Sequence, residues 1–330
     1  VPEAVALTTP GDRKAVYDLM LLQCQKMEDR FAILDVIHTP SASIQTDADN
    51  FRNNDVGADN LKYGASYYPG LNTTIEYNYN LGENDPPNPP ISVSTVTIND
   101  QRTSNPLNGL SLNDIASDGT TPDTSIYQGI ISELALQRVL LYPSASMAGT
   151  YARVDDSRGV WKAPANVGLS LVVNPQLLIN NEEQGNLNVD SVSGKSINAI
   201  RQFTGRGNLV WGARTLAGND NEWRYINVRR LFLFAEESIK KATEFVVFEP
   251  NTASTWAKVS GMTESFLTSL WRDGGLAGAT PEEAFFIRVG LGSTMTSQDV
   301  LEGRMIVEIG LAAVRPAEFI ILRFSHKLQE

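Results

Sequence analysis

A predicted helix followed at once by a predicted buried strand is the feature that most constrains how this chain folds. Asp12 is suited to cap a helix that runs to about Lys26. We expect four apolar side chains to form the buried face of this helix: Val16, Leu19, Met20 and Leu22. The short apolar run at 31–37 then predicts a strand covered on both faces. This succession predicts an α/β (α+β) fold, with a mixed sheet as its core and helices packed on it.

The C-terminal half continues the alternation of helices and strands. Over residues 224–243, apolar residues recur at intervals of three and four, which predicts a helix with one buried stripe. The stripe consists of Val228, Leu231, Phe232, Ala235, Ile239 and Ala242. On the opposite face, Glu236–Lys240 and Glu237–Lys241 are pairs with the acid first, the favourable i,i+4 order.

A second helix is expected to start near Thr252, just after Pro250, and to end at the glycines 274–275. Its stripe consists of Trp256, Val259, Phe266 and Leu270. Strands are predicted from Phe285 to Val289 and from Met305 to Val314. A last strand is predicted from Phe319 to Leu328, following Pro316.

The middle of the chain is dominated by Asn, Asp, Gly, Pro, Ser and Thr. The run NDPPNPP at 84–90 excludes a helix, whereas SVSTVTI at 92–98 alternates like a strand. We expect residues 81–127 to be an inserted, surface-exposed loop or β-rich module between two parts of one core, residues 1–80 and 128–330. A disordered loop is the alternative, because the segment has few aromatic residues.

Composition excludes several classes of protein. The net charge of −11 is concentrated in residues 41–130, where eleven acidic residues stand against three basic ones. Such acidity argues against a nucleic-acid partner, which requires a basic surface to bind phosphates. No run of eighteen apolar residues is present, so we expect no membrane insertion.

The ends and the single cysteine add two expectations. Cys24 is the only cysteine, so no intramolecular disulfide is expected, and a reducing compartment is the simplest interpretation. The chain opens with Val1 and not with Met, so we expect a trimmed or partly observed polypeptide.

The tetrapeptide SGKS at 193–196 resembles the end of a phosphate-binding loop. The full pattern requires a glycine five residues before Gly194, and that position is Val189. We therefore interpret these residues as a turn and the start of a helix, with Ser196 or Lys195 at the helix N-terminus.

No other catalytic or metal-binding constellation is present in the sequence. The two histidines, His38 and His326, stand near opposite ends of the chain. There is no HExxH pattern, no paired cysteine and no GxSxG elbow. We expect no catalytic residue, no cofactor and no metal site.

Several separated motifs carry a family resemblance. They are MAGTYARVDDSRGVWKAPAN at 147–166, VWGARTL at 210–216, WRYINVRRL at 223–231, FEPN at 248–251 and RPAEFIILR at 315–323, preceded by EDRFAILD at 28–35 and YGASYYPG at 63–70. Together they resemble the C-terminal part of contractile tail sheath proteins of phages, tailocins and extracellular injection systems. The resemblance is looser before residue 70 and absent from about 81 to 127.

The resemblance implies a structural role without catalysis. Family sheaths stack as hexameric rings around an inner tube, and contraction from a metastable extended state drives the tube through a target envelope. The implied partners are copies of the same chain, the inner tube protein, and baseplate and tail-terminator proteins. Assembly would take place in the bacterial cytoplasm, before the sheath becomes part of a phage tail or an extracellular particle. The family also implies an N-terminal arm longer than this chain shows.

The resemblance also selects residues. The family motif residues are Arg153, Asp155, Arg158, Gly159, Trp161, Pro164, Asn166, Trp211, Arg214, Arg229, Arg230, Glu249, Pro250 and Asn251. In VDDSRGVWKAPAN we expect a turn in which the carboxylates pair with Arg158 and Gly159 permits an unusual backbone; a cation site is the weaker alternative. Whether the contacts of the motif arginines lie within or between subunits stays open.

Two surfaces are expected to meet partners. Family sheaths donate strands between neighbours, so the inter-subunit strand would include Glu318, Phe319, Ile320, Ile321, Leu322, Arg323 and Phe324. Pairing within its own subunit is the alternative. Lys258 and Arg272, on the predicted helix after Thr252, are possible contacts to the tube.

Two other functional classes remain in view. A hydrolase or nucleotide-dependent enzyme would need a constellation that the sequence lacks. A cell-surface or carbohydrate-binding module would have to use residues 81–127.

Overall fold

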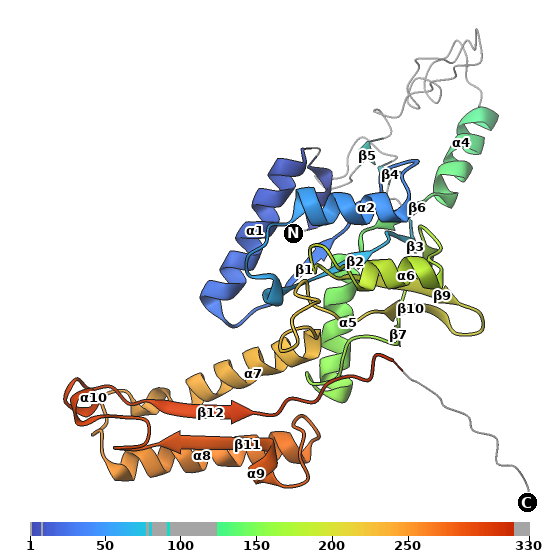
Figure 1. The fold of residues 1–330 in the computed structure, drawn as a ribbon. Coiled ribbons are helices and arrows are strands. Elements are labelled where there is room, and N and C mark those ends of the chain that lie inside the picture. The colour runs from blue at the N-terminus through green and yellow to red at the C-terminus, as the bar shows by residue number, and fades with distance from the viewer. Residues whose placement is uncertain (1, 8, 77–78, 81–90, 93–123, 320–330) are drawn as a thin grey trace, which may run out of the picture. The chain divides into compact units, whose positions relative to one another are not determined.

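The computed structural model describes residues 2–7, 9–76, 79–80, 91–92 and 124–319 (Figure 1). The chain forms two compact units. The first comprises Val1–Pro69, Tyr142–Leu169 and Leu177–Glu330, and the second comprises Gly70–Leu141 and Ser170–Gln176. No helix in the described residues is long and apolar enough to cross a membrane.

The first unit is built on a five-stranded mixed sheet in the order β1-β2-β9-β10-β7. Its strands are β1 (Ala32–Asp35), β2 (Gly64–Tyr68), β9 (Ile197–Phe203), β10 (Gly207–Trp211) and β7 (Val167–Gly168). The first three are parallel to one another, whereas β10 is antiparallel to both β9 and β7. All five residues of β2 are buried, as expected for a central strand with both faces covered. The mixed sheet confirms the predicted fold class.

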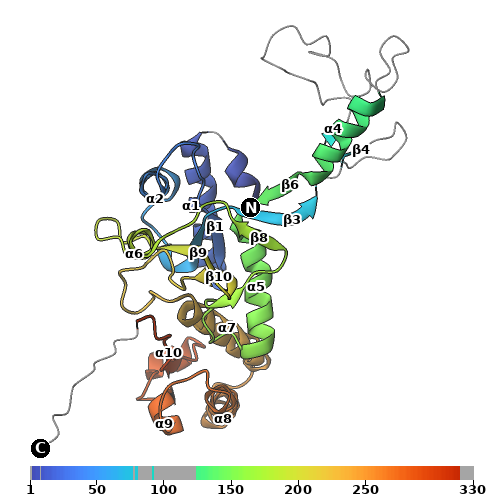
Figure 2. The ribbon, with the colours of Figure 1, turned by 90° about the vertical axis from the view of Figure 1, so that its right-hand side faces the viewer.

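Helices cover both faces of this sheet. Leu34 packs with Leu21 of α1 (Pro10–Met27), while the side chain of the next residue, Asp35, accepts a hydrogen bond from the Ser144 amide of α5 (Pro143–Arg158). Because successive strand side chains point to opposite faces, α1 and α5 lie on opposite sides of β1 (Figure 2). The helices α2 (Ile44–Asn50) and α6 (Asn181–Asn188) also contact each other.

The buried face of α1 agrees in part with the expected one, because Val16 and Met20 are partly buried and pack against the core. Its core residues are Tyr17, Leu21 and Cys24, and Leu19 is exposed. The helix begins at Pro10, with Thr9 and not Asp12 at the N-cap position.

A second hydrophobic core joins two helices and a hairpin. Its elements are α7 (Ile226–Ala242), α8 (Ala253–Arg272), β11 (Phe285–Val289) and β12 (Val307–Leu311). Leu231, Leu267 and Phe285 are buried together in it. The two helices and β11 agree with the predicted ranges, whereas β12 is shorter than predicted. The predicted last strand from Phe319 to Leu328 lies, apart from Phe319, outside the described residues.

Short elements complete the first unit. They are η1 (Pro2–Ala6), the π-helical turn η2 (Phe51–Asp55), η3 (Leu61–Tyr63), η5 (Glu244–Val246), α9 (Pro281–Ala284) and α10 (Ser297–Leu301).

The second unit holds a three-stranded antiparallel sheet in the order β6-β3-β8. Its strands are β3 (Leu71–Glu76), β6 (Arg138–Leu141) and β8 (Val172–Pro175), and α4 (Thr124–Leu136) leads into β6. The strands β4 (Tyr79–Asn80) and β5 (Ile91–Ser92) form a parallel pair. Of the predicted insertion 81–127, only residues 91–92 and 124–127 are described, and the predicted strand at 92–98 falls outside them except for Ser92.

Candidate assembly sites

The C-terminal segment of the described chain is held on the first unit by a partly buried carboxylate, that of Glu318. Arg214 donates to both oxygens of Glu318, from Nε at 2.8 Å and from Nη2 at 2.7 Å. The same carboxylate accepts a hydrogen bond from Asn188 Nδ2 at 2.6 Å and one from the Tyr225 hydroxyl at 3.1 Å. We call this cluster the Glu318 clip.

The charge state of the clip follows from its surroundings. Burial alone would raise the pKa of Glu318, but the hydrogen bonds from Arg214 and Asn188 hold that pKa below its ordinary value. Burial and the Glu318 carboxylate raise the pKa of the Tyr225 phenol. Glu318 is therefore ionised and Tyr225 neutral at pH 7.

The clip is tied to the central sheet. The side chain of Asn198, in β9, accepts a hydrogen bond from the Arg214 amide at 2.8 Å and donates one to the Arg214 carbonyl at 2.8 Å. Asn227, in α7, donates to the carbonyl of Trp161 at 2.9 Å and to that of Val314 at 3.1 Å. Residues 314–318 are thus held at both ends.

Residues from several of the sequence motifs lie around the C-terminal segment 314–319. A groove of about 790 Å³ is lined by Val314 to Phe319 together with four motif residues, Arg158, Trp161, Asn166 and Trp211. Gly159 connects α5 to this lining with φ at +87°, and a Cβ there would lie 2.4 Å from the Trp161 ring. Glycine is therefore required for the close approach of backbone and ring.

The expected ion pair between Asp155 and Arg158 is wrong, because Asp155 has a different partner. These residues form the last turn of α5, and Asp155 pairs with both terminal nitrogens of Arg230, with one distance of 2.9 Å. Arg230 also stacks over the Tyr151 ring at 4.7 Å. Arg158 instead lines the groove formed with residues 314–319.

Arg229 stacks between aromatic rings, 4.6 Å from the centroid of Tyr63 and 4.8 Å from that of Trp223. Its guanidinium reaches Glu236 at 3.4 Å. The predicted pair of Glu236 with Lys240 is therefore not the one observed, whereas Glu237–Lys241 forms at 3.1 Å. The motif arginines Arg214, Arg229 and Arg230 all contact residues of their own chain.

The remaining motif residues fix local backbone. Arg153 donates to the Gly168 carbonyl, and Pro164 is buried. Asn166, at φ +57°, accepts a hydrogen bond from Arg206 at 2.5 Å. In FEPN, the Pro250 carbonyl accepts from Thr255 Oγ1 and Asn251 Oδ1 from Trp256 Nε1, both at 2.7 Å, so this motif frames the start of α8. Glu249 lines a neighbouring groove.

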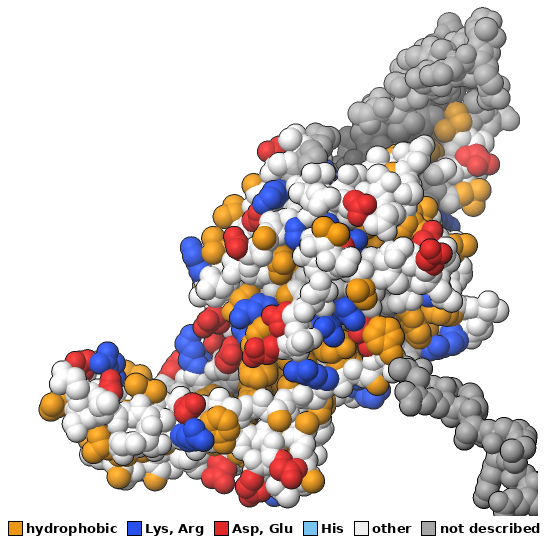
Figure 3. All heavy atoms as spheres, viewed as in Figure 1, with side chains coloured by type: hydrophobic (Ala, Val, Ile, Leu, Met, Phe, Trp, Pro, Cys, Tyr) orange, Lys and Arg blue, Asp and Glu red, His pale blue; other side chains and the backbone are white. Residues whose placement is uncertain are grey.

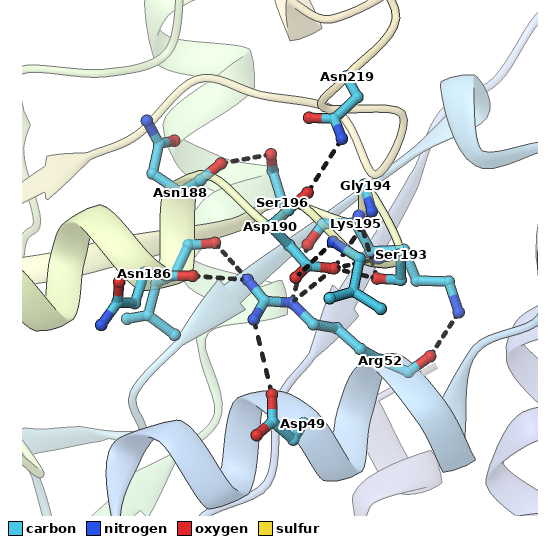
Figure 4. A network of polar contacts seen from close by, with 12 residues as sticks. Asp49, Arg52, Asn186, Asn188, Asp190, Ser193, Gly194, Lys195, Ser196 and Asn219 are labelled. Atoms are coloured by element: carbon cyan, nitrogen blue, oxygen red, sulfur yellow. Dashed lines mark hydrogen bonds and ion pairs between the residues drawn. The ribbon is translucent and has the colours of Figure 1, made fainter.

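The backbone amides of the SGKS loop and its neighbour bind a carboxylate of the same chain, that of Asp190 (Figure 4). The Asp190 carboxylate accepts hydrogen bonds from the amides of Val192, Ser193 and Gly194 at 3.3, 2.6 and 3.1 Å. These amides are the donors that a phosphate would need. The chain then enters β9 at Ile197, so the expected helix start is wrong and only the turn is confirmed.

The lysine of this loop points inward. Lys195 Nζ donates to the carbonyls of Arg52 and Val56, the latter at 2.7 Å, and burial lowers its pKa. Arg52 in turn donates from Nε to the Lys195 carbonyl at 3.0 Å and from Nη2 to the Asn186 carbonyl at 2.8 Å. These hydrogen bonds connect η2 to the residues just before β9, so the loop has a structural role.

The β11–β12 hairpin presents open edges. Among the described residues, no further strand pairs with the outer edge of β11 or of β12. A groove of about 1040 Å³, which we call the α7–β12 groove, lies beside β12. Its lining includes Phe232, Ala235 and Ile239 of α7, and Val307, Ile309 and Leu311 of β12. Figure 3 shows hydrophobic side chains among charged ones on the surface over these elements.

The outer face of α8 carries the two expected tube contacts. Lys258 and Arg272 are exposed, and neither forms an ion pair within the described part of the chain. The opposite face buries Val259, Leu267 and Leu270.

An anchored terminal segment and an open sheet edge on one chain are typical of proteins that assemble by adding strands to one another. The family model described as the phage tail sheath C-terminal domain matches residues 218–327. The helical sheath of the anti-feeding prophage (AFP) in its contracted state is 35% identical, with a TM-score of 0.65, and the match covers 96% of this chain and 67% of that chain.

Two further relatives agree. The sheath complex of PVC, an extracellular contractile injection system, in its contracted state is 36% identical over 90% of this chain and 64% of that chain, with a TM-score of 0.65. The tail sheath protein of Enterobacteria phage T4 is 27% identical over 124 residues, which is 38% of this chain and 18% of the T4 protein. The chain belongs to the family of contractile tail sheath proteins. It spans only part of the length of these relatives.

Proposed function

We propose that the chain is a structural subunit of a contractile sheath, which polymerises as stacked hexameric rings around an inner tube and contracts from a metastable extended state. Family membership carries this proposal. The work would come from new burial and charge pairing between subunits, so no nucleotide, cofactor or catalytic residue is needed. The internal filling of the SGKS loop by Asp190 supports this view.

Strand donation would connect the copies. Glu318 and Phe319 start the proposed inter-subunit strand, and Ile320, Leu322 and Phe324 follow on one face. The Glu318 clip would hold the base of this strand on its own subunit, and Phe319, 68% exposed, leads away from the clip. The open edge of β12 in another copy is the proposed acceptor, because an exposed edge has main-chain groups available for a partner strand.

Strand donation would be stabilised by the burial of apolar side chains and by new main-chain hydrogen bonds. Each large apolar side chain contributes about 1.5–3 kcal/mol on burial. Each added ladder hydrogen bond contributes roughly 0.5–1.5 kcal/mol. A few of each suffice to hold neighbours together while the subunits rotate.

Truncation after Phe319 tests the proposal, because it removes the donated part and keeps the Glu318 clip. We expect soluble, folded monomers that form no tubes by electron microscopy. A chain that lacks only residues 326–330 keeps the apolar face and should assemble. Tubes formed by the shorter chain would contradict strand donation.

The other partners follow from the family. We propose that the exposed face of α8, with Lys258 and Arg272, contacts the inner tube, and that the sheath ends meet baseplate and tail-terminator proteins. Assembly would occur in the bacterial cytoplasm, and the finished sheath would belong to a phage tail or an extracellular particle. Residues 81–127 would decorate the outer surface as an insertion between the core parts 1–80 and 128–330.

A further inference from the structure

Phe248 is an exposed aromatic residue in a backbone conformation that aromatic residues rarely adopt. Its φ is +71° and its side chain is fully exposed, at 103% of the reference area. A bulky residue in the left-handed region is strained, and strain of this kind persists where the surroundings impose it. Among the described residues, no side chain covers the Phe248 ring.

The segment around Phe248 is fixed on both sides. The Val247 amide donates to the Glu244 carbonyl at 3.2 Å, and the Glu249 amide donates to the Val246 carbonyl at 3.0 Å. Pro250 then accepts the hydrogen bond from Thr255 that opens α8. The backbone that carries the ring is therefore held by its neighbours.

Val247 and Phe248 line the α7–β12 groove together with the β12 residues Val307 and Ile309. Val247 is also largely exposed, at 64%. Phe245, although equally part of this segment and half exposed, does not line the groove. The two exposed side chains thus stand at the border of a space that is apolar and open.

The occupant of this space must be extended. The outer edge of β12 offers main-chain hydrogen bonds, which an extended segment satisfies. Every second side chain of such a segment would point to the face of Val307, Ile309 and Leu311, and so into the groove. The chain contains a segment with apolar residues at that spacing, Ile320, Leu322 and Phe324.

We infer that Val247 and Phe248 form a clamp that closes over the strand donated by another copy of this chain into the α7–β12 groove. This inference rests on the proposed function, because it takes the occupant from it. Phe248 acts as a positioning residue: its ring covers the apolar face of the strand, and the left-handed backbone aims it there. The strain is offset when the strand is in place.

The substitution Phe248→Gly separates the clamp from a role in folding. Glycine adopts positive φ without strain, so the isolated chain should keep its urea unfolding midpoint or raise it. A fluorescein-labelled peptide of residues 317–330 serves as the probe, and its binding to the chain is measured by anisotropy. We expect Phe248→Gly to raise the Kd at least tenfold. Phe245→Ala, which removes a ring outside the groove, should change the Kd less than twofold.

The possible outcomes separate the clamp from strand donation. Equal peptide affinity in wild type and Phe248→Gly would overturn the clamp and leave strand donation standing. A wild-type chain that binds no peptide would overturn the occupant, and with it both the clamp and strand donation. A large loss of folding stability in Phe248→Gly would show that the ring serves its own chain, against our inference.

Discussion

Among single residues, Glu318 contributes most to holding the described C-terminal segment, because three side chains donate four hydrogen bonds to its carboxylate. Glu318→Gln keeps the shape and removes the charge, which leaves the buried guanidinium of Arg214 without its carboxylate. We expect the free energy of unfolding at pH 7 to fall by about 1.5–3 kcal/mol. Urea unfolding of both chains measures this.

The pH dependence has a definite sign. The pKa of Glu318 is held below its ordinary value of 4.5, so its stabilisation is present above that pH and is lost as the pH falls below it. The difference between wild type and Glu318→Gln should therefore shrink as the pH falls through the lowered pKa of Glu318. Glu308→Gln is the control, because Glu308 and Arg288 are exposed and 3.7 Å apart. It should cost no more than about 0.5 kcal/mol. A gap that stays constant with pH would contradict the clip.

Lys195 is the second test at this scale. Lys195→Ala leaves the carbonyls of Arg52 and Val56 without their donor inside the protein. We expect a loss of about 1–3 kcal/mol in the free energy of unfolding. Nucleotide affinity should be absent both in this variant and in wild type. A measurable affinity that disappears with the substitution would show that the loop binds phosphate after all.

Residue-level contacts were the hardest to predict from sequence. The Arg214–Glu318 pair joins positions 104 residues apart, and the motif arginines gave no sign of their partners. Asp155 was expected to pair with Arg158 nearby, but the end of α5 turns it toward Arg230. Spacing in sequence predicts neighbours on one element, and tertiary packing chooses the rest.

At the scale of elements, periodicity predicted α7, α8 and β11 well because each presents one apolar face to one core. It was only partly right for the face of α1: Val16 and Met20 pack against the core, but Tyr17 is buried there and Leu19 is exposed. A tyrosine that donates its hydroxyl to a carbonyl, as Tyr17 does to Asp35 at 3.1 Å, is as suited to the core as a leucine.

The outer face of α8 yields a prediction about tube docking. Lys258→Glu with Arg272→Glu reverses two exposed charges that have no ion pair in the described residues. We expect fewer tube-filled sheaths by electron microscopy, an unchanged melting temperature and intact contracted sheath. The matched control, Lys240→Glu with Lys241→Glu, reverses two charges on α7, where Glu237 is their partner. Unaltered tube-filled particles in the α8 variant would remove this assignment.

At the scale of the whole molecule, the mixed sheet was predictable from the first helix and strand, and the family from separated motifs. The division into two units was not, because β8 joins the second unit from a distant part of the chain. A strand of four residues with a partner a hundred positions away carries no local signal of that pairing.

The proposed insertion gives a prediction at this scale. Replacement of residues 81–123 by a Gly/Ser linker leaves α4 complete, since that helix begins at Thr124. We expect sheaths to assemble, because surface loops tolerate change better than the core. Folded, soluble protein that no longer forms particles would place the segment in the lattice.

The connection between the Glu318 clip and β9 has a mechanical consequence. A pull on the chain beyond Phe319 would act first on the Glu318 carboxylate, then on Arg214, and through its backbone on Asn198 in the middle of the five-stranded sheet. Tension between copies would thus be borne by the most buried part of the subunit. The β11–β12 hairpin, which has only two strands, would not bear the force transmitted by the chain beyond Phe319.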